Sequence, residues 1–406
     1  MSGLLTQIGE KISDSRVASS LESIGIKLFK EKREEIAEAE TEKSEEFYRA
    51  GQWQLVWWKF KRHKLAQLGM IVLAVFYTMA IFAGFIAPHD PLHRYKEYSA
   101  SPPTRIYIRD LNGNLRAPFI YQYVRGRDPV TMRPVYKANA DVTYPVQLFV
   151  KGDPYEFWGL FETDIHLFGT PGTEAQPFFL LGSDGLGRDV FSRICHGSRI
   201  SLTVGLVGVS LSFILGLILG GVSGYFGGVP DDIIQRIIEV LTSLPTIPLW
   251  MALAAALPQN WPQLRIYFGT TIILSIVGWT GLARVVRGKM LSMREEDFVM
   301  AAHLDGESEW KIITRYMLPG FTSYIIVSLT GSLPGMILGE TALSFLGIGL
   351  HPPTISWGVM LQDAQDLMVV AQLPWVLWPV AFVVTAVLMF NFVGDGLRDA
   401  ADPYVT

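Results

Sequence analysis

EDFVMAAHLDGESEWKIITRYMLP, residues Glu296–Pro319, is a polar and charged stretch that lies between two strongly apolar segments of the chain. The neighbouring segments are apolar enough to cross a membrane, whereas the stretch itself carries charges that are costly to bury in lipid. This alternation predicts a loop that joins two membrane-spanning helices.

The composition is that of a mixed membrane protein. Half of the 406 residues are hydrophobic, 18% are charged and the mean hydropathy is +0.28, which is too apolar for an ordinary soluble protein and too polar for a chain lying wholly in the membrane. The formal net charge is -4 and no long basic block occurs, so nucleic acid is not expected as a partner. Cys195 is the only cysteine, which excludes an intrachain disulfide and a cysteine-based zinc site.

Six segments are long and apolar enough to cross a hydrocarbon core, which takes about 20 helical residues. They are Leu65–Ile86, Ile200–Val222, Ile237–Leu257, Phe268–Val286, Phe321–Leu346 and Trp375–Val393. Prolines that interrupt these runs indicate kinks packed against protein, at Pro245, Pro248 and Pro334. Glycines in the second segment are spaced for close helix contacts, at Gly205, Gly208, Gly216, Gly220 and Gly221. The sequence therefore predicts an all-α polytopic membrane protein with six spans.

Orientation follows from Lys and Arg, which accumulate in short cytoplasmic loops. Lys59, Lys61, Arg62 and Lys64 precede the first span and place the N-terminus inside. With six crossings the quoted stretch is cytoplasmic too, in agreement with its basic flanks at Arg284, Arg287, Lys289, Arg294, Lys311 and Arg315. The first span begins too far into the chain for a secretory signal and is expected to remain as an anchor.

The chain is expected to divide into five parts. They are a cytoplasmic N-terminal tail with an interfacial helix (1–64), the first transmembrane helix (65–86), a small extracytoplasmic β-rich insertion (87–180), a core of five transmembrane helices with the cytoplasmic loop 292–319 (181–396) and a cytoplasmic C-terminal tail (397–406). In the first part, Glu31–Glu46 is a charged, solvated run, and Trp53–Phe60 (WQLVWWKF) predicts a helix lying on the lipid surface.

Strand patterns occur in the insertion. Arg105–Tyr123 alternates apolar and polar residues on both sides of Asn112-Gly113, which is a hairpin signal. Tyr144–Val150 is typical of a further strand. Both patterns predict β-structure between the first and second spans.

The quoted stretch itself predicts a helix–turn–helix. Ser292 and Glu295 form an S-x-x-E capping box that would start a helix, and Gly306 would end it in a left-handed turn. Ala301-Ala302 would give this helix a small face that another surface can approach closely. Ser308 would cap a second short helix, which Leu318-Pro319 would close before the next span. From these residues alone, a docking element and a merely well-folded loop both remain open.

A resemblance favours docking. Ala301-Ala302, Gly306 and Leu318-Pro319 match the spacing of the "EAA" loop (E-A-A-x-x-x-G, nine residues, I-x-L-P) of permease subunits of binding-protein-dependent ABC importers, although Met300 and Tyr316 depart from that general pattern. Three further stretches resemble the C-type permease of the peptide/nickel importer family: LGSDGLGRDVFSRICHGSRISL (Leu181–Leu202), GETALSFLGIGLHPPTISWGVML (Gly339–Leu361) and NFVGDGLRDAADP (Asn391–Pro403).

The resemblance implies the transmembrane fold of a type I ABC importer. It implies as partners a second homologous permease subunit, two cytoplasmic ATPase subunits and an extracytoplasmic solute-binding protein, in the cytoplasmic (inner) membrane of a bacterium or archaeon, with both termini in the cytoplasm. The residues that it assigns to ATPase docking are Asp297, Ala301, Ala302, Gly306, Leu318 and Pro319. No cofactor is expected on this chain, since ATP and Mg would bind to the ATPase subunits.

Signals of other chemistry are weak. No G-x-x-x-x-G-K-[ST] phosphate loop occurs, because Gly281–Met290 contains a Gly-Lys pair but has the wrong glycine spacing and ends in Met. Gly182, Gly185 and Gly187 are typical of a turn that leads into a membrane-surface helix. Among the seven histidines only His89 and His93 are four residues apart, and this pair lies in the β-rich insertion and not on a predicted helix, so no metal site is expected.

Glu340 is an acidic residue in an apolar run, and is either a candidate for the translocation path or an interfacial residue near the end of the fifth span. The protein is not expected to be an enzyme. The expected function is a permease subunit for di- or oligopeptides, driven by ATP hydrolysis on separate subunits, with oligosaccharides or metal chelates as alternative substrates. A secondary transporter and a Ser-based intramembrane hydrolase are the rival classes; the first would show ionisable residues at the midplane and the second a G-x-S-x-G elbow.

Overall fold

The computed structural model describes residues 51–110, 113–129, 134–171, 176–258 and 260–401, in two units, Met1–Arg62 and His63–Thr406. The first unit contains α3 (Gln52–Phe60), where the rings of Trp57 and Phe60 stack with centroids 5.9 Å apart. This confirms the helix predicted at Trp53–Phe60, while its place on the lipid surface stays a prediction. The charged run Glu31–Glu46 lies outside the described residues.

In the described part of the second unit, five helices are long and apolar enough to cross a membrane. They are α4 (Lys64–Ile81), α6 (Val190–Phe226), α9 (Gln263–Met293), the helical run Glu309–Phe345, which ends in α12 (Thr322–Phe345), and the run Pro374–Ala401, which ends in α15 (Trp378–Ala401). Five of the six predicted spans coincide with these helices. Several of the helices continue past the predicted ends, because a helix can extend into polar surroundings that an apolar window does not register.

The remaining predicted span, Ile237–Leu257, is not one straight helix. It falls on α7 (Gly228–Ser243) and α8 (Thr246–Ala255), which meet at a bend of 91°. Leu244 has an extended backbone at the bend, the conformation that a following proline imposes, and Pro245 follows it. Pro334, in contrast, is buried within α12. Among the described residues, the number of candidate spans is therefore five, or six if the bent pair crosses as one.

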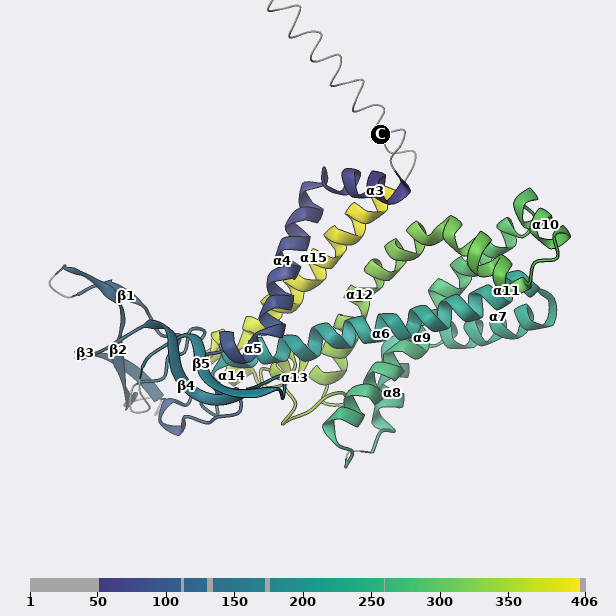
Figure 1. The fold of residues 1–406 in the computed structure, drawn as a ribbon. Helices are drawn as coiled ribbons and strands as arrows, with labels where there is room; N and C mark the ends of the chain where they lie inside the picture. The colour runs from purple at the N-terminus through teal and green to yellow at the C-terminus, as the bar shows by residue number, and fades with distance from the viewer. Residues whose placement is uncertain (1–50, 111–112, 130–133, 172–175, 259, 402–406) are drawn as a thin grey trace, which may run out of the picture. The chain divides into compact units, whose positions relative to one another are not determined.

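Close approach between helices builds the core of the second unit. α4 lies beside α15 (Figure 1), and a Cβ atom at Gly69 of α4 would stand only 2.7 Å from the carbonyl oxygen of Met389. α6 approaches α9 in the same way, since a Cβ at Gly220 would be 2.5 Å from the carbonyl oxygen of Ala283. The predicted contact role of Gly221 is wrong, because nothing lies within 4 Å of a Cβ placed there.

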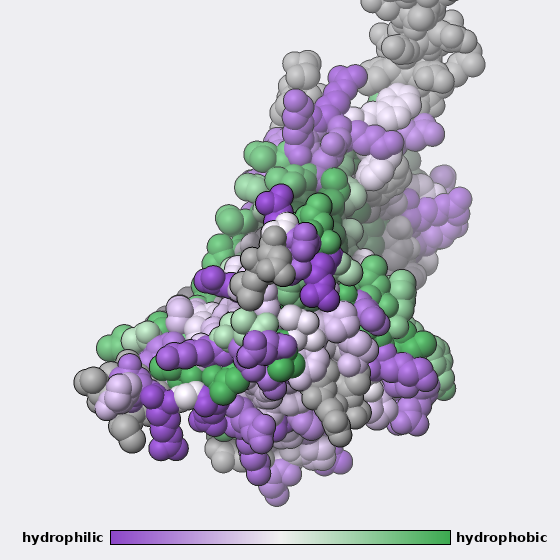
Figure 2. Space-filling view, turned by 90° about the vertical axis from the view of Figure 1, so that its left-hand side faces the viewer, coloured by the Kyte–Doolittle hydropathy of each residue, from purple (hydrophilic) through white to green (hydrophobic). Residues whose placement is uncertain are grey.

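The region between the first two long helices contains two antiparallel sheets. One has the order β1-β2-β3 and the other pairs β4 with β5. Their bounds are β1 (Tyr107–Arg109), β2 (Leu115–Arg127), β3 (Pro134–Pro145), β4 (Gln147–Phe157) and β5 (Phe161–Gly169). In Figure 1 these strands lie together at the end of α6 where that helix begins. Figure 2 looks from that side and shows hydrophobic residues in green mainly across the middle of the face, with hydrophilic residues in purple above and below them.

The hairpin predicted within Arg105–Tyr123 is present as β1 and β2, which pair Tyr107 with Phe119; Asn112 lies outside the described residues. The single strand predicted at Tyr144–Val150 is wrong. β3 ends at Pro145, which has no N–H to continue the ladder, and β4 begins at Gln147 in the other sheet. The sequence signal therefore merged the end of one strand with the start of the next.

The shorter helices of the second unit connect these parts. They are α5 (Ala83–Ile86), η1 (Lys96–Tyr98), α10 (Asp297–Leu304), α11 (Glu309–Lys311), η2 (Ile312–Met317), η3 (Leu318–Phe321), α13 (Trp357–Gln362), α14 (Leu367–Gln372) and η4 (Pro374–Leu377). The predicted turn at Gly182–Gly187 is present and leads into α6, capped by Asp189, whose carboxylate accepts from the N–H groups of Phe191 and Ser192. The helix after the turn is the first part of long α6 and not a separate membrane-surface helix.

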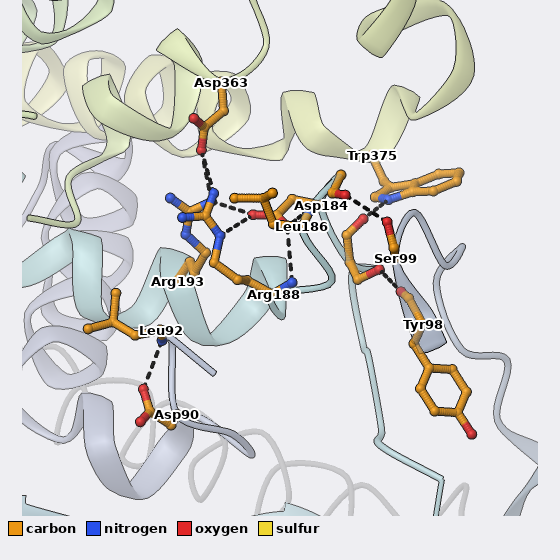
Figure 3. A network of polar contacts seen from close by, with 12 residues as sticks. Asp90, Leu92, Tyr98, Ser99, Asp184, Leu186, Arg188, Arg193, Asp363 and Trp375 are labelled. Carbon is orange, nitrogen blue, oxygen red and sulfur yellow. Dashed lines mark hydrogen bonds and ion pairs between the residues drawn. The ribbon is translucent and has the colours of Figure 1, made fainter. Parts of the chain in front are cut away.

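A buried ionic network ties the start of α6 to the segment after α13 (Figure 3). Arg188 donates from Nε to Asp184 Oδ2 at 2.7 Å and from Nη2 to Asp363 Oδ2 at 2.9 Å. Arg193 donates from Nη1 to the same two oxygens at 2.7 and 3.0 Å. Two positive and two negative side chains thus balance one another, as buried charges require. The network joins two parts of the chain that lie far apart in sequence.

Candidate functional site

The loop Glu296–Pro319 begins with a separate helix, α10. The helix starts at Asp297, with Glu296 in extended conformation before it and no side-chain cap. The capping box predicted at Ser292 and Glu295 is wrong, because α9 continues through Ser292 to Met293.

α10 ends in the left-handed turn that the sequence predicts. Gly306 has φ of 74° and its N–H donates to the carbonyl oxygen of His303 at 3.0 Å, while the N–H of Glu307 donates to that of Ala302 at 3.1 Å. These two bonds are those of a Schellman motif, which satisfies carbonyl groups left open at a helix end. The turn therefore has one defined geometry.

The second helix of the loop does not stop at Leu318-Pro319. Ser308 stands at the N-cap of α11 but its side chain makes no capping bond. From Glu309 the helical run passes through η2, a π-helical segment, and through η3 into α12. Pro319 is accommodated because it lies in the first turn of η3, where no N–H is needed. The predicted closure of the unit is wrong, and the loop is instead directly continuous with a candidate span.

The inner side of the loop packs on the ends of three long helices. Val299 and Ala302 of α10 belong to one buried cluster with Ile312 and Met317. The cluster also contains Tyr225 of α6, Val286 and Met290 of α9, Phe321 of η3 and Ile325 of α12. A displacement of the loop would therefore act on all three helices, because closely packed side chains transmit strain.

Polar contacts add to this packing at the end of α6. The hydroxyl of Tyr225 lies 3.2 Å from His303 Nε2 and donates to the carboxylate of Glu309. Arg294 donates to the carbonyl oxygen of Tyr225 at 3.3 Å. One tyrosine thus contacts both helices of the loop and the residue that follows α9.

The outer face of α10, defined by Asp297, Met300, Ala301 and Leu304, is exposed. Helical spacing places these four residues on the side opposite Val299 and Ala302. Met300 is 50% exposed and Leu304 is 88% exposed. Nearby, Trp310 is 73% exposed. Apolar side chains of this size, exposed side by side, are typical of a surface that a partner covers.

The structure separates the predicted docking residues into two groups. Asp297 and Ala301 lie on the outer face, Gly306 makes the turn and Pro319 is exposed. Ala302 is only 4% exposed, so the small surface that it provides is used by this chain's own cluster; the expectation that Ala302 offers it outward is wrong. Leu318 is half-buried against the same cluster.

Sequence reasoning missed the exposed apolar residues Met300 and Leu304. The available signal was Leu304, an apolar residue among polar neighbours directly before Asp305-Gly306. Helical spacing from Ala301 would have placed it on the same face.

Glu340 lies in α12 with no exposed surface. Its carboxylate accepts hydrogen bonds from Ser344 at 2.9 Å and from Ser201 of α6 at 3.3 Å. Ser201 Oγ in turn accepts the N–H of Trp357 at 3.0 Å. Glu340 therefore connects α12, α6 and α13, and its predicted place in a translocation path stays a prediction.

The segment Gly281–Met290, with its Gly-Lys pair, lies inside α9, whereas a phosphate loop precedes a helix. Within the described part of the chain, no group of three or more His, Cys, Asp or Glu side chains is placed to hold a metal ion.

Two families match the chain. Residues 212–406 match the family described as binding-protein-dependent transport system inner membrane component, and residues 51–103 match the N-terminal TM domain of oligopeptide transport permease C.

Named relatives agree with these matches. The dipeptide transport system permease protein DppC of Bacillus subtilis is 31% identical over 351 residues, which cover 86% of this chain and 85% of the relative. The oligopeptide transport system permease protein OppC of Haemophilus influenzae is 38% identical over 259 residues, covering 63% of this chain and 80% of the relative. Among solved structures, an inward-facing form of the MetNI methionine ABC transporter aligns over 51% of this chain and 95% of its own, with 17% identity and a TM-score of 0.39.

Proposed function

The chain belongs to the C-type permeases of the peptide/nickel family of binding-protein-dependent ABC importers, and from this premise we propose that it forms part of a translocation path for di- or oligopeptides across the cytoplasmic membrane. ATP would be hydrolysed, with Mg, on two separate ATPase subunits. The names of its relatives, which are dipeptide and oligopeptide permeases, support peptides over the alternative oligosaccharides and metal chelates. A secondary transporter and an intramembrane hydrolase do not fit this membership.

The observation that supports the proposal most is the outer face of α10. Three of its four residues, Met300, Ala301 and Leu304, are apolar and exposed, and the inner side of the same helix is packed against α6, α9 and α12. An ATPase subunit that covers this face would be mechanically connected to three long helices. Closure of two ATPase subunits would then tilt these helices between inward-open and outward-open states.

The remaining partners follow from the family. A second homologous permease subunit would complete the path, and an extracytoplasmic solute-binding protein would deliver the peptide. With both termini in the cytoplasm, α10 would face the ATPase subunits and the strands would face the solute-binding protein.

Substitutions on α10 test the docking. Ala301→Trp and Leu304→Glu change exposed positions, so both variants should fold and enter the membrane normally. Burying a leucine in an interface contributes about 1.5–3 kcal/mol, so Leu304→Glu should weaken association with the ATPase by about tenfold or more. The measurement is the amount of ATPase that co-purifies with each variant, together with peptide uptake in vesicles.

Two further variants make the result interpretable. Glu307→Gln changes a charge beside the turn and should leave association unchanged. Ala302→Trp overfills the buried cluster and should reduce the amount of folded protein itself. Normal ATPase association and uptake for both Ala301→Trp and Leu304→Glu would refute docking at this face.

A further inference from the structure

The β4–β5 hairpin carries an apolar tip that remains largely exposed among the described residues. The tip is Phe157–Phe161, FWGLF, in which Leu160 is 79% exposed, Phe161 is 58% exposed and Trp158 is 55% exposed. Phe157 pairs with Phe161 across the end of the two strands. Five consecutive apolar or glycine residues at an exposed hairpin end call for a partner surface.

The tip is fixed at the end of α4. Trp158 donates from its indole N–H to the carbonyl oxygen of Ile81, the last residue of α4, at 2.9 Å. The guanidinium of Arg199 stacks on the Trp158 ring at 5.1 Å and donates to the carbonyl oxygen of Ala80 at 2.7 Å. Figure 1 shows β4 and β5 beside α5, at this end of α4. The tip is therefore held where a candidate membrane span ends.

The backbone of the tip is shaped for this position. Trp158 has φ of 54°, followed by Gly159 with φ of 69°. A tryptophan in the left-handed region is unfavourable. The two contacts of the Trp158 side chain, which hold the indole on the end of α4, offset this unfavourable backbone conformation.

The exposed apolar surface of the tip continues that of the span. Ile71 and Val75 of α4 are exposed, as are Ile81 and Phe82 at its end, and lipid covers such residues in a membrane-spanning helix. The Phe82 ring lies 5.9 Å from that of Phe157. Trp and other amphipathic rings gather where a membrane meets water, because one part of the ring is apolar while another binds polar groups.

We propose that the Phe157–Phe161 tip lies in the interfacial layer of the lipid bilayer on the side of the strands, as a lipid contact separate from the transmembrane helices. The contact itself does not depend on the transported substrate or on ATPase docking. Glu156 and Glu162, which pair directly opposite each other and are exposed, limit how far the hairpin enters. Because carboxylates are expensive to bury in lipid, only the five tip residues enter the layer.

Spin labelling tests this placement. Leu160→Cys is made in a Cys195→Ala background of the full-length chain, labelled with a nitroxide and reconstituted in phosphatidylcholine nanodiscs together with the subunits that co-purify. Oxygen concentrates in lipid, whereas a nickel chelate stays in water. The ratio of oxygen collisions to chelate collisions should therefore be several-fold higher for the label at Leu160 than for the label at the control position.

The matched control is Leu115→Cys, because Leu115 is also an exposed leucine on a strand, at 73%, but lies in the other sheet. Its label should be reached readily by the chelate. Equal chelate access at Leu160 and Leu115 would show that water covers the tip and would overturn the proposal. Protection of Leu160 from both oxygen and chelate would also overturn it, since a protein partner would then cover the tip.

Discussion

His89 shows how the surroundings of one side chain set its chemistry. It follows α5 and is half-buried, and the N–H of Phe178 donates to its Nε2 at 3.1 Å. The ring proton must therefore lie on Nδ1, which donates to the hydroxyl oxygen of Tyr95 at 3.0 Å. Burial lowers the pKa of His89 to about 4, and the nearby carboxylate of Asp153 opposes this shift only in part. His89 is thus a neutral structural group.

This burial predicts a loss of stability in acid. Because the folded pKa of about 4 lies below the unfolded value of 6.5, the stabilising effect of neutral His89 is complete above pH 6.5 and is lost as the pH falls toward 4. The expected loss is about 2 kcal/mol between pH 7 and pH 5. His89→Gln, which cannot be protonated, should be less stable at pH 7 but should lose less on acidification. Thermal unfolding of both proteins at the two pH values measures the difference; equal losses would contradict the assignment.

At the level of an element, the turn between α10 and α11 depends on one backbone conformation. Nothing lies within 4 Å of a Cβ placed at Gly306, so a side chain there meets no clash and only the left-handed backbone resists it. Gly306→Val should therefore cost about 1 kcal/mol or more. Hydrogen exchange of the amides of Gly306 and Glu307 should accelerate about fivefold for each kcal/mol lost. Gly306→Asn is the control, because Asn tolerates the left-handed backbone conformation. If these amides exchange as slowly in the valine variant as in the asparagine variant, the argument is refuted.

The same element shows which parts of the site the sequence could predict. Gly306 was predictable because a glycine after an apolar helix has few other roles. The start of α10 was not, since Ser292 and Glu295 form a local capping pattern while Met290 and Met293 pack with the loop's buried cluster and keep α9 helical. The orientation of Ala302 was equally hidden, because a run of two alanines does not say which one faces the core. The sequence predicted the strands from their alternation of apolar and polar residues and the spans from the length of their apolar segments. It could not predict where these elements end, because the ends depend on such tertiary contacts.

For the whole molecule, the open structural question is whether the bent pair α7–α8 crosses the membrane. Asp231 of α7 binds Arg287 of α9 at 2.6 Å, and Leu257, after α8, lies against Gly269 of α9. Between Gly269 and Arg287 α9 rises about 27 Å at 1.5 Å per residue, close to the thickness of a hydrocarbon core at about 30 Å. The pair thus runs along most of a crossing helix, which favours six spans.

Side-specific labelling decides this point. In a Cys195→Ala background, Asn260→Cys, between α8 and α9, should be labelled from the same side of the membrane as Leu115→Cys in β2. Ser308→Cys, in the loop between α10 and α11, should be labelled only from the opposite side. Labelling of Asn260→Cys from the side of Ser308→Cys would mean that α7 and α8 form a re-entrant loop, and that the chain crosses five times.

The ionic network of Asp184, Arg188, Arg193 and Asp363 also has a consequence for biosynthesis. Arg193 and Asp363 are 170 residues apart in sequence, so at 5–20 residues per second the ribosome makes the second roughly 10–30 s after the first. During that interval Asp184 is the one carboxylate of this network that has been synthesised, and both arginines must share it. The start of α6 can therefore reach its final packing only after the segment following α13 has been synthesised, and a nascent chain halted before Asp363 should present an unfinished end to the membrane-insertion machinery.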